Sequence, residues 1–189
     1  MRRGFSLIEF MVTLGVIGVV LLLVAPWMSD WMQNTQIRNG ADSLLTGLKL
    51  ARMEALKRNS PVLFQMMTSI DATCGLSTSG ANWVVSVNSA VTQCGGDSLS
   101  TPFIIRKKGS GEGTNNVVYA ATQASIGFDA LGRVTPAPAS DIVVFVTNPT
   151  GGDCVPGGPM RCQAVVVTAG GQTRMCDPAV SDATDPRAC

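Results

Sequence analysis

The sequence predicts an α+β protein in which one long N-terminal helix packs against antiparallel β-sheet. Apolar residues dominate from Phe10 to Trp27, and from there to Asn59 they recur every three or four positions. That spacing is typical of a helix with one buried face. After Pro61 the pattern changes to short β-rich runs separated by glycine-rich breaks. Because the helix comes first and all the strands follow it, the order of elements favours an α+β fold in which antiparallel sheets pack against a single helix.

An apolar segment long enough to cross a membrane lies near the N-terminus. Phe10 to Trp27 spans 18 residues, and extension back to Phe5 reaches the length of a spanning helix. Arg2 and Arg3 precede the segment, so the N-terminus is expected in the cytoplasm and the chain after Trp27 outside it. Bulky residues follow the segment in place of the small-residue site of a cleaved secretory signal. The apolar helix is therefore expected to remain in the mature protein.

Glu9 is the only charged residue between Arg3 and Asp30. A carboxylate at membrane depth is costly, and it therefore indicates a functional site with a cationic partner. No such cation lies in this helix. A free α-amine on another copy or relative of the chain would serve, if the chain were cut after Gly4. The alternative is a side chain that reaches the headgroup level.

The second half of the helix is predicted to be amphipathic. It ends before Pro61, because a residue that precedes proline avoids the helical region. A continuous helix from Phe5 to Asn59 would extend roughly 80 Å. Pro26 removes one backbone hydrogen bond and predicts a kink, although the membrane helix could also simply end there. The expected apolar stripe comprises Ile37, Ala41, Leu44, Leu45, Leu48, Ala51, Ala55 and Leu56.

The remainder of the chain is predicted to form short strands separated by glycine-containing turns. No internal repeat is evident, and no proline-rich stretch is long enough to serve as a domain linker. The expected strands are Val62–Met67, Trp83–Val87, Phe103–Lys107, Val117–Ala121, Ile126–Asp129, Ile142–Thr147, Ala164–Thr168 and Thr173–Cys176.

Six cysteines follow the apolar segment, and an even number on one side of it indicates an oxidising compartment. The sequence alone allows 15 pairings. We favour the pairing of nearest neighbours, because each bond would close a loop with little core of its own. Free thiols in a cytoplasmic protein are the alternative. The favoured pairs are Cys74–Cys94, Cys154–Cys162 and Cys176–Cys189.

Histidine is absent, which removes the most common general base and the most common zinc ligand. Cys154 and Cys162 are not spaced as a redox or zinc motif. A serine or cysteine nucleophile would lack its usual base. The sequence therefore predicts no enzymatic activity, no cofactor and no metal site, and the net charge of +1 gives no overall attraction to nucleic acid.

The segment Gly4-Phe5-Ser6-Leu7-Ile8-Glu9 resembles the class III signal of type IV pilins and type II secretion pseudopilins. The resemblance implies that a prepilin peptidase cuts between Gly4 and Phe5 and that Phe5 is then N-methylated. It also implies that Glu9 pairs with a neighbouring subunit's N-terminus during assembly. Pro26 corresponds to the position where the helix of such proteins bends or melts within the filament.

Three further segments narrow the resemblance to the group of minor pilins that includes FimT, FimU and the pseudopilin GspH. They are Ala51–Asn59, the strand–turn–strand segment Gly127–Val134, and the ending that contains Cys176-Asp177-Pro178 and Asp185–Cys189. The implied fold is the type IV pilin fold. Residues 1–4 would be a cleaved leader, 5–28 a transmembrane and assembly helix, 29–60 an amphipathic helix, and 61–189 a periplasmic β-rich domain.

The resemblance implies a structural subunit of a filament. The chain would span the bacterial inner membrane once, and would then enter a pilus or pseudopilus. Its partners would be other major and minor pilins, the prepilin peptidase, the membrane and the inner-membrane assembly platform. The expected function is that of a minor type IV pilin in pilus assembly, twitching motility or adhesion. A type II secretion pseudopilin of the GspH type is an alternative that the residues do not separate.

A second alternative is a pilin that binds DNA during natural transformation. Some FimT-type members carry a C-terminal Gly-Arg-x-Arg motif, and Gly171-Gln172-Thr173-Arg174 matches it except that Gln172 replaces the first arginine. Arg174 and Arg187 would form a small cationic patch if the last disulfide drew them together. Lys107 and Lys108 lie in a basic turn that could also meet phosphates. The more ordinary interpretations are an edge strand and a solvated hairpin tip.

Overall fold

The computed structural model describes residues 7–182 and 184–189, with the side chains of residues 23–27 left out. Gly4 and Phe5, the expected cleavage and methylation positions, therefore lie outside the described residues. The side chain of Pro26 also lies outside them, although helix α1 continues through that position.

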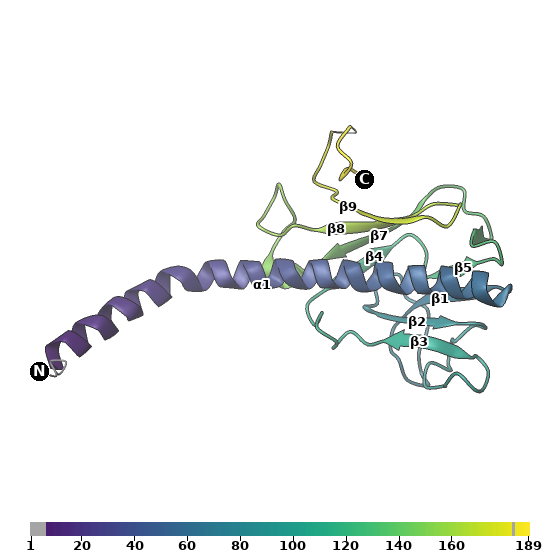
Figure 1. Cartoon of the computed structure of the whole chain (residues 1–189), viewed down its shortest axis with the longest axis horizontal. Coiled ribbons are helices and arrows are strands. Elements are labelled where there is room, and N and C mark those ends of the chain that lie inside the picture. Colours follow the sequence, from purple (N-terminus) through teal and green to yellow (C-terminus); the bar gives the residue numbers. More distant parts are fainter. Residues whose placement is uncertain (1–6, 183) are drawn as a thin grey trace, which may run out of the picture.

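Helix α1 runs from Leu7 to Arg58 and organises the molecule. Its N-terminal half projects from the molecule, whereas its C-terminal half passes between the two sheets in the view of Figure 1. At 1.5 Å per residue, its 52 residues extend about 80 Å. The α+β class predicted from the sequence, with one long N-terminal helix, is confirmed.

The end of α1 follows from three consecutive residues. Asn59 adopts a positive φ of 49°, which asparagine tolerates better than most residues. The amides of Asn59 and Ser60 donate to the carbonyl oxygens of Leu56 and Ala55, which closes the helix with a Schellman motif. Pro61 follows and cannot continue the helix.

The expected transmembrane segment, residues 5–28, is described only in part. Residues 5 and 6 lie outside the described residues, and so do the side chains of 23–27. Among the residues that were searched, no helix has both the length and the apolar character that a membrane crossing requires.

The strands form two antiparallel sheets, one on each side of α1 in Figure 1. The five-stranded sheet has the order β3 (Ile104–Lys108), β2 (Asn82–Ser86), β1 (Val62–Met67), β5 (Ser125–Phe128) and β6 (Val134–Thr135). The four-stranded sheet has the order β4 (Val118–Ala121), β7 (Ile142–Thr147), β8 (Gln163–Val167) and β9 (Thr173–Cys176). A short 3-10 helix, η1 (Pro149–Gly151), follows β7. Strand β6 has only two residues and was not among the strands expected from the residue pattern.

The main core is shared by the helix and both sheets. Strand β7 shows the alternation of a sheet with one face on the core, because Ile142, Val144 and Val146 are buried in the main core. The buried stripe on α1 agrees with the predicted one except at two positions: Leu45 is only partly buried, and Leu56, in the last turn, is 48% exposed. The core positions of α1 are Ile37, Ala41, Leu44, Leu48, Ala51 and Ala55.

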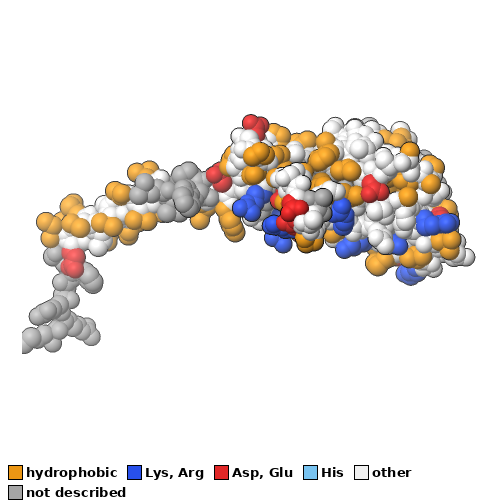
Figure 2. Space-filling view, turned by 90° about the horizontal axis from the view of Figure 1, so that it is seen from above, with side chains coloured by type: hydrophobic (Ala, Val, Ile, Leu, Met, Phe, Trp, Pro, Cys, Tyr) orange, Lys and Arg blue, Asp and Glu red, His pale blue; other side chains and the backbone are white. Residues whose placement is uncertain are grey.

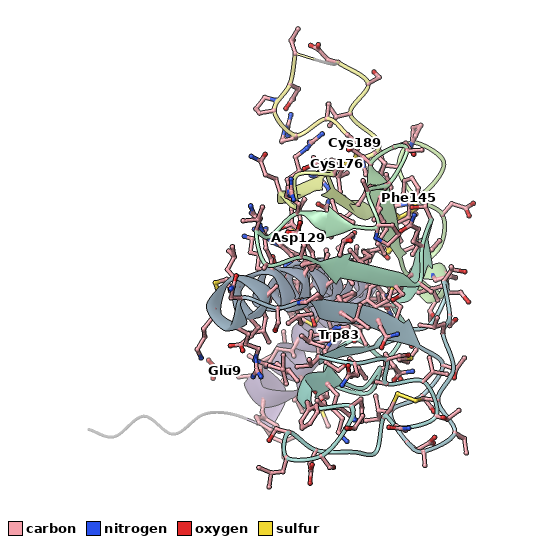
Figure 3. The ribbon with its side chains drawn as sticks, turned by 90° about the vertical axis from the view of Figure 1, so that its right-hand side faces the viewer. Glu9, Trp83, Asp129, Phe145, Cys176 and Cys189 are labelled. Atoms are coloured by element: carbon pink, nitrogen blue, oxygen red, sulfur yellow. A yellow bond between two sulfur atoms is a disulfide. The ribbon has the colours of Figure 1, made fainter. Side chains whose placement is uncertain are left out.

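The outer faces of the sheets carry two smaller cores, each joined to a disulfide. Cys74 and Cys94 bond to each other and pack with Met67, Val84 and Ile104 on the five-stranded sheet. On the four-stranded sheet, Cys176 packs with Ala164 and Val166 and bonds to Cys189 (Figure 3). The third disulfide joins Cys154 to Cys162. The described chain therefore contains the three nearest-neighbour pairs and no free cysteine.

The helix packs tightly against the five-stranded sheet at Gly47. A Cβ atom there would lie 2.8 Å from Phe64 Cε2 and 3.1 Å from Trp83 Cη2. Both rings are buried and in contact with each other, with centroids 5.6 Å apart, so neither can move away freely. The absence of a side chain at Gly47 therefore sets how closely helix and sheet pack.

We predict that Gly47→Val lowers the free energy of unfolding by about 2 kcal/mol, because the new methyl groups overpack the ring pair. Thr46→Val adds the same side chain at the exposed neighbouring position and should change stability by less than about 0.5 kcal/mol. Urea denaturation of both full-length variants would measure the difference. Equal stability of the two variants would contradict the close packing at Gly47.

Candidate functional site

The projecting half of α1 exposes apolar side chains on every side. Between Leu7 and Leu22 the large hydrophobic residues are between 51% and 78% exposed. They form no single stripe, and Figure 2 shows this part of the helix as a narrow, mostly apolar extension from the rest of the molecule. A helix that is apolar all round is normally buried all round. This surface therefore needs partners beyond the residues that contact it within the chain.

Glu9 lies in the first turn of α1, as the single carboxylate of this apolar segment. A negative charge in the first turn is favoured by the partial positive charge at the helix N-terminus. The sequence singled out Glu9 for its charge within an apolar run, and the structure places it in the first turn of α1, at the end of the helix that projects from the globular part (Figure 1).

The position where α1 enters the globular part is fixed by polar contacts with the loop after β7. The amide of Arg161 donates to Asn34 Oδ1 over 2.6 Å, and Asn34 Nδ2 donates to the carbonyl oxygen of Pro159. Asn148 donates to Gln33 Oε1. The Cys154–Cys162 bond closes this loop, and the hydrogen bonds of Asn34 join the closed loop to the helix.

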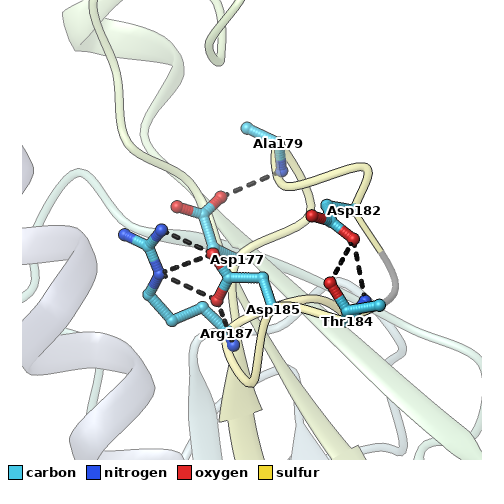
Figure 4. A network of polar contacts seen from close by, with 6 residues as sticks. All are labelled: Asp177, Ala179, Asp182, Thr184, Asp185 and Arg187. Carbon is cyan, nitrogen blue, oxygen red and sulfur yellow. Dashed lines mark hydrogen bonds and ion pairs between the residues drawn. The ribbon is translucent and has the colours of Figure 1, made fainter.

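The C-terminal tail after β9 is held in place by short-range polar contacts, shown in Figure 4. The Arg187 guanidinium makes hydrogen bonds to both carboxylate oxygens of Asp185, the shortest of 2.6 Å. These bonds lower the pKa of Asp185 to about 2 and raise the pKa of Arg187. The amide of Asp177 donates to the carbonyl oxygen of Arg187, which joins the tail to the end of β9.

The four cations predicted as DNA contacts do not form one surface. Arg174 lies on β9 and donates to the carbonyl oxygens of Ala188 and Cys189, so it anchors the tail. Arg187 is in the same region but is paired with Asp185. Lys107 and Lys108 belong to β3, in the five-stranded sheet on the other side of α1 (Figure 1).

The basic run around Lys107 and Lys108 also differs from the expected exposed turn. These residues extend strand β3, and the turn begins at Gly109. Lys107 donates to the carbonyl oxygen of Cys94. Lys108 is 8% exposed and donates to Thr114 Oγ1, and its burial lowers the pKa of the amine. Lys108 is therefore not presented to solvent as a phosphate contact.

A cleft of about 530 Å³ lies where α1 enters the globular part. Its walls come from α1, β8, β9 and the tail, and they include the three arginines Arg38, Arg161 and Arg187. Sequence reasoning singled out Arg187 but neither of the others. Arg38 and Arg161 are far apart in the chain, and no local motif marks them. They meet because β8 and β9 pack beside the helix.

The described residues offer little for catalysis or metal binding. Among them, no group of three histidine, cysteine, aspartate or glutamate side chains is arranged to hold a metal ion. All six cysteines are in disulfides. The features that remain are an apolar surface, a buried spine and a basic cleft, which suit assembly and binding.

We predict that the attachment of the tail depends on pH through Asp185. Because its pKa is lowered from 3.8 to about 2 in the folded chain, its stabilising contact is complete above about pH 4 and is lost as the pH falls through about 2. The protection of the Asp177 amide from hydrogen exchange, relative to the intrinsic rate at each pH, should fall over that range, and Asp185→Ala should lower it at neutral pH. Asp129→Ala, which removes the partner of Arg133 elsewhere, should leave exchange at Asp177 unchanged.

Comparison with known proteins gives two matches to protein families. A family model described as type II transport protein GspH matches residues 40–171. The prokaryotic N-terminal methylation motif matches residues 1–25. A pilin-like protein of Thermus thermophilus is 39% identical over 67 residues, which cover 35% of this chain and 42% of that relative. The chain therefore spans less than half the length of this relative.

Two solved structures resemble the chain. The type IV minor pilin FimU of Pseudomonas aeruginosa matches with a TM-score of 0.53 and 13% identity, over 77% of this chain and 91% of that one. Escherichia coli GspH matches with a TM-score of 0.47 and 13% identity, over 80% and 94% of the two chains. The likeness to FimU shows the type IV pilin fold, as the sequence predicted.

Proposed function

The chain belongs to the family of type II transport protein GspH, and from this premise we propose that it acts as a minor type IV pilin. Members of this family are structural subunits, either minor pilins or pseudopilins, whose precursors are anchored in the membrane before assembly. The finer assignment to a pilus is supported by the fold shared with FimU. In this role the chain enters a filament or helps to prime it, in association with other pilins.

The exposed apolar half of α1 is the observation that carries this proposal. The large hydrophobic side chains from Leu7 to Leu22 cannot remain in water, because each would lose about 1.5–3 kcal/mol of burial free energy. In the precursor, lipid would cover them. In the filament, the helices of neighbouring subunits would cover them. One surface thus serves both states, and assembly exchanges lipid contacts for helix contacts.

Glu9 would direct this exchange. Apolar contacts alone do not fix how far one helix slides along another, since they have little directionality. A carboxylate paired with the α-amine of a neighbouring Phe5 would fix that position, because an unpaired charge in an apolar environment is costly. The globular part, held to the same helix by the shared core, would then take a defined place on the filament surface.

We predict that the mature chain begins with N-methylated Phe5. This follows from the match to the methylation motif over residues 1–25 and from Gly4 at the expected cut. Mass spectrometry of the protein from cells that carry the prepilin peptidase would detect the shortened, methylated N-terminus. Deletion of the peptidase should leave residues 1–4 in place. An unprocessed N-terminus in the presence of the enzyme would contradict the proposal.

We predict that Glu9→Ala reduces incorporation into filaments by about tenfold or more, because the charge that positions the subunit is lost. Immunoblotting of sheared filaments and of membranes would separate assembly from insertion, and the amount in membranes should not change. Asp30→Asn removes a carboxylate from the same helix beyond the apolar segment and serves as the control. Normal incorporation of the Glu9→Ala chain would overturn the role of Glu9.

Deletion of the chain addresses the pseudopilin alternative. If the chain enters pili, its deletion should reduce surface piliation while secretion of type II substrates continues. The reverse result would assign it to a type II secretion system. DNA uptake gains no support from the geometry, because Arg174 holds the tail and Lys108 is buried.

A further inference from the structure

We propose that the basic cleft at the point where α1 enters the globular part binds the phosphate of an anionic phospholipid headgroup. The cleft measures about 530 Å³, and its walls include Trp31, Asn34, Arg38, Arg161 and Arg187. This inference rests on the proposed membrane-anchored precursor. It adds a second attachment to the membrane, separate from the apolar helix.

The charges of the cleft favour a single anionic group. Arg187 is paired with Asp185, and Asp177 contributes one carboxylate to the wall. Arg38 and Arg161 are exposed, and neither side chain has an ion pair or hydrogen bond within the described residues. Two guanidinium groups without partners remain on one cleft. Guanidinium groups suit phosphate because their planar N–H donors can contact two oxygens together.

The position of the cleft fits the headgroup layer. Trp31 is 67% exposed, and Met28 and Met32, at 56% and 49%, continue the apolar surface of the projecting helix up to the cleft. Tryptophan is enriched at the boundary between membrane and water. From Leu7 to Trp31 the helix rises about 36 Å, which is close to the thickness of the hydrocarbon core with one headgroup layer.

The arginines lie just beyond this boundary. Arg38 follows Trp31 by seven residues, a rise of about 10 Å, and Arg161 is held beside Asn34. Long basic side chains extend toward phosphates from such positions. In Figure 2, some Lys and Arg side chains lie at the end of the globular part from which the helix projects, and others lie farther along the same face.

The cleft is poorly suited to nucleic acid. Sequence-independent DNA binding depends on several phosphate contacts along an extended basic surface. Here Arg38 and Arg161 line one open cleft of limited size, and Asp177 forms part of its wall. Lys107 and Lys108 lie on the other sheet and cannot extend the patch. A ligand with one net negative phosphate matches this arrangement better than a polyanion.

Binding of a headgroup would orient the globular part before assembly. The apolar helix alone allows the globular part to tilt relative to the membrane surface. A phosphate held by arginines on α1 and on the loop before β8 would restrict that tilt by drawing this side of the globular part toward the headgroups. The contact would be released when the subunit leaves the membrane.

The test uses the full-length chain in non-ionic detergent. It is titrated with short-chain phosphatidylglycerol, phosphatidylcholine of the same chain length, inorganic phosphate and a short single-stranded oligonucleotide. Native mass spectrometry gives the affinities, and hydrogen exchange locates the binding. We expect phosphatidylglycerol to bind most tightly and to protect residues 31–38 and 161–163.

The variant Arg38→Gln/Arg161→Gln should weaken phosphatidylglycerol binding about thirtyfold, because it removes two basic contacts to the lipid phosphate and each contributes to the binding free energy. Arg106→Gln, an exposed arginine on β3, is the matched control and should change it by less than about twofold. Circular dichroism would show that each variant is folded, which is expected because all three side chains are exposed.

Equal binding of the two lipids, or unchanged binding in the double variant, would overturn the proposal. Protection of the same residues by inorganic phosphate without competition from phosphatidylglycerol would assign the cleft to a free anion instead. Protection by the oligonucleotide alone would assign it to nucleic acid. Each of these results would leave the assembly role of Glu9 standing, because that role is measured separately in filaments.

Discussion

The shared burial of one helical stripe holds this fold together. Six small or aliphatic residues of α1, from Ile37 to Ala55, contact the inner faces of both sheets at once. Neither sheet has a complete core without the helix, because the alternate residues of β1 and β7 point toward it. Tyr119 adds a polar link, since its buried hydroxyl donates to the carbonyl oxygen of Gly40. The globular part therefore cannot move independently of the C-terminal half of α1.

The disulfides extend this arrangement to regions that the helix does not reach. The helix covers only one face of each sheet, and a second face of a sheet needs its own cover if it is apolar. Loops closed by Cys74–Cys94 and Cys176–Cys189 supply that cover, on opposite sides of the molecule. The loop closed by Cys154–Cys162 instead contacts α1 through Asn34. Chain segments with few apolar residues thus become fixed parts of the surface.

Most of the fold could be predicted because its signals are local. The period of three to four along α1 and the β-rich runs identified the helix and eight strands, whereas β6, with two residues, is too short to carry a pattern. Glu9 could be found for the same reason, as a charge inside an apolar run. The cleft could not be predicted from the sequence, because Arg38 and Arg161 come to line it only through the packing of β8 beside α1. The prediction that Lys108 lies in an exposed turn was wrong, because a run of basic residues does not reveal which side chain of a strand points inward.

The two halves of α1 differ in which environment suits their surfaces, and this difference draws attention to their junction. The C-terminal half buries one stripe against protein, so its remaining surface is suited to water. The N-terminal half exposes apolar side chains all round, so it is suited to lipid or to other helices. One continuous helix carries both surfaces, so the apolar half and the globular part are joined without an intervening loop. Polar and basic groups at the junction, around Asn34 and Arg38, lie where the two surfaces meet, and the proposed headgroup contact would be made there.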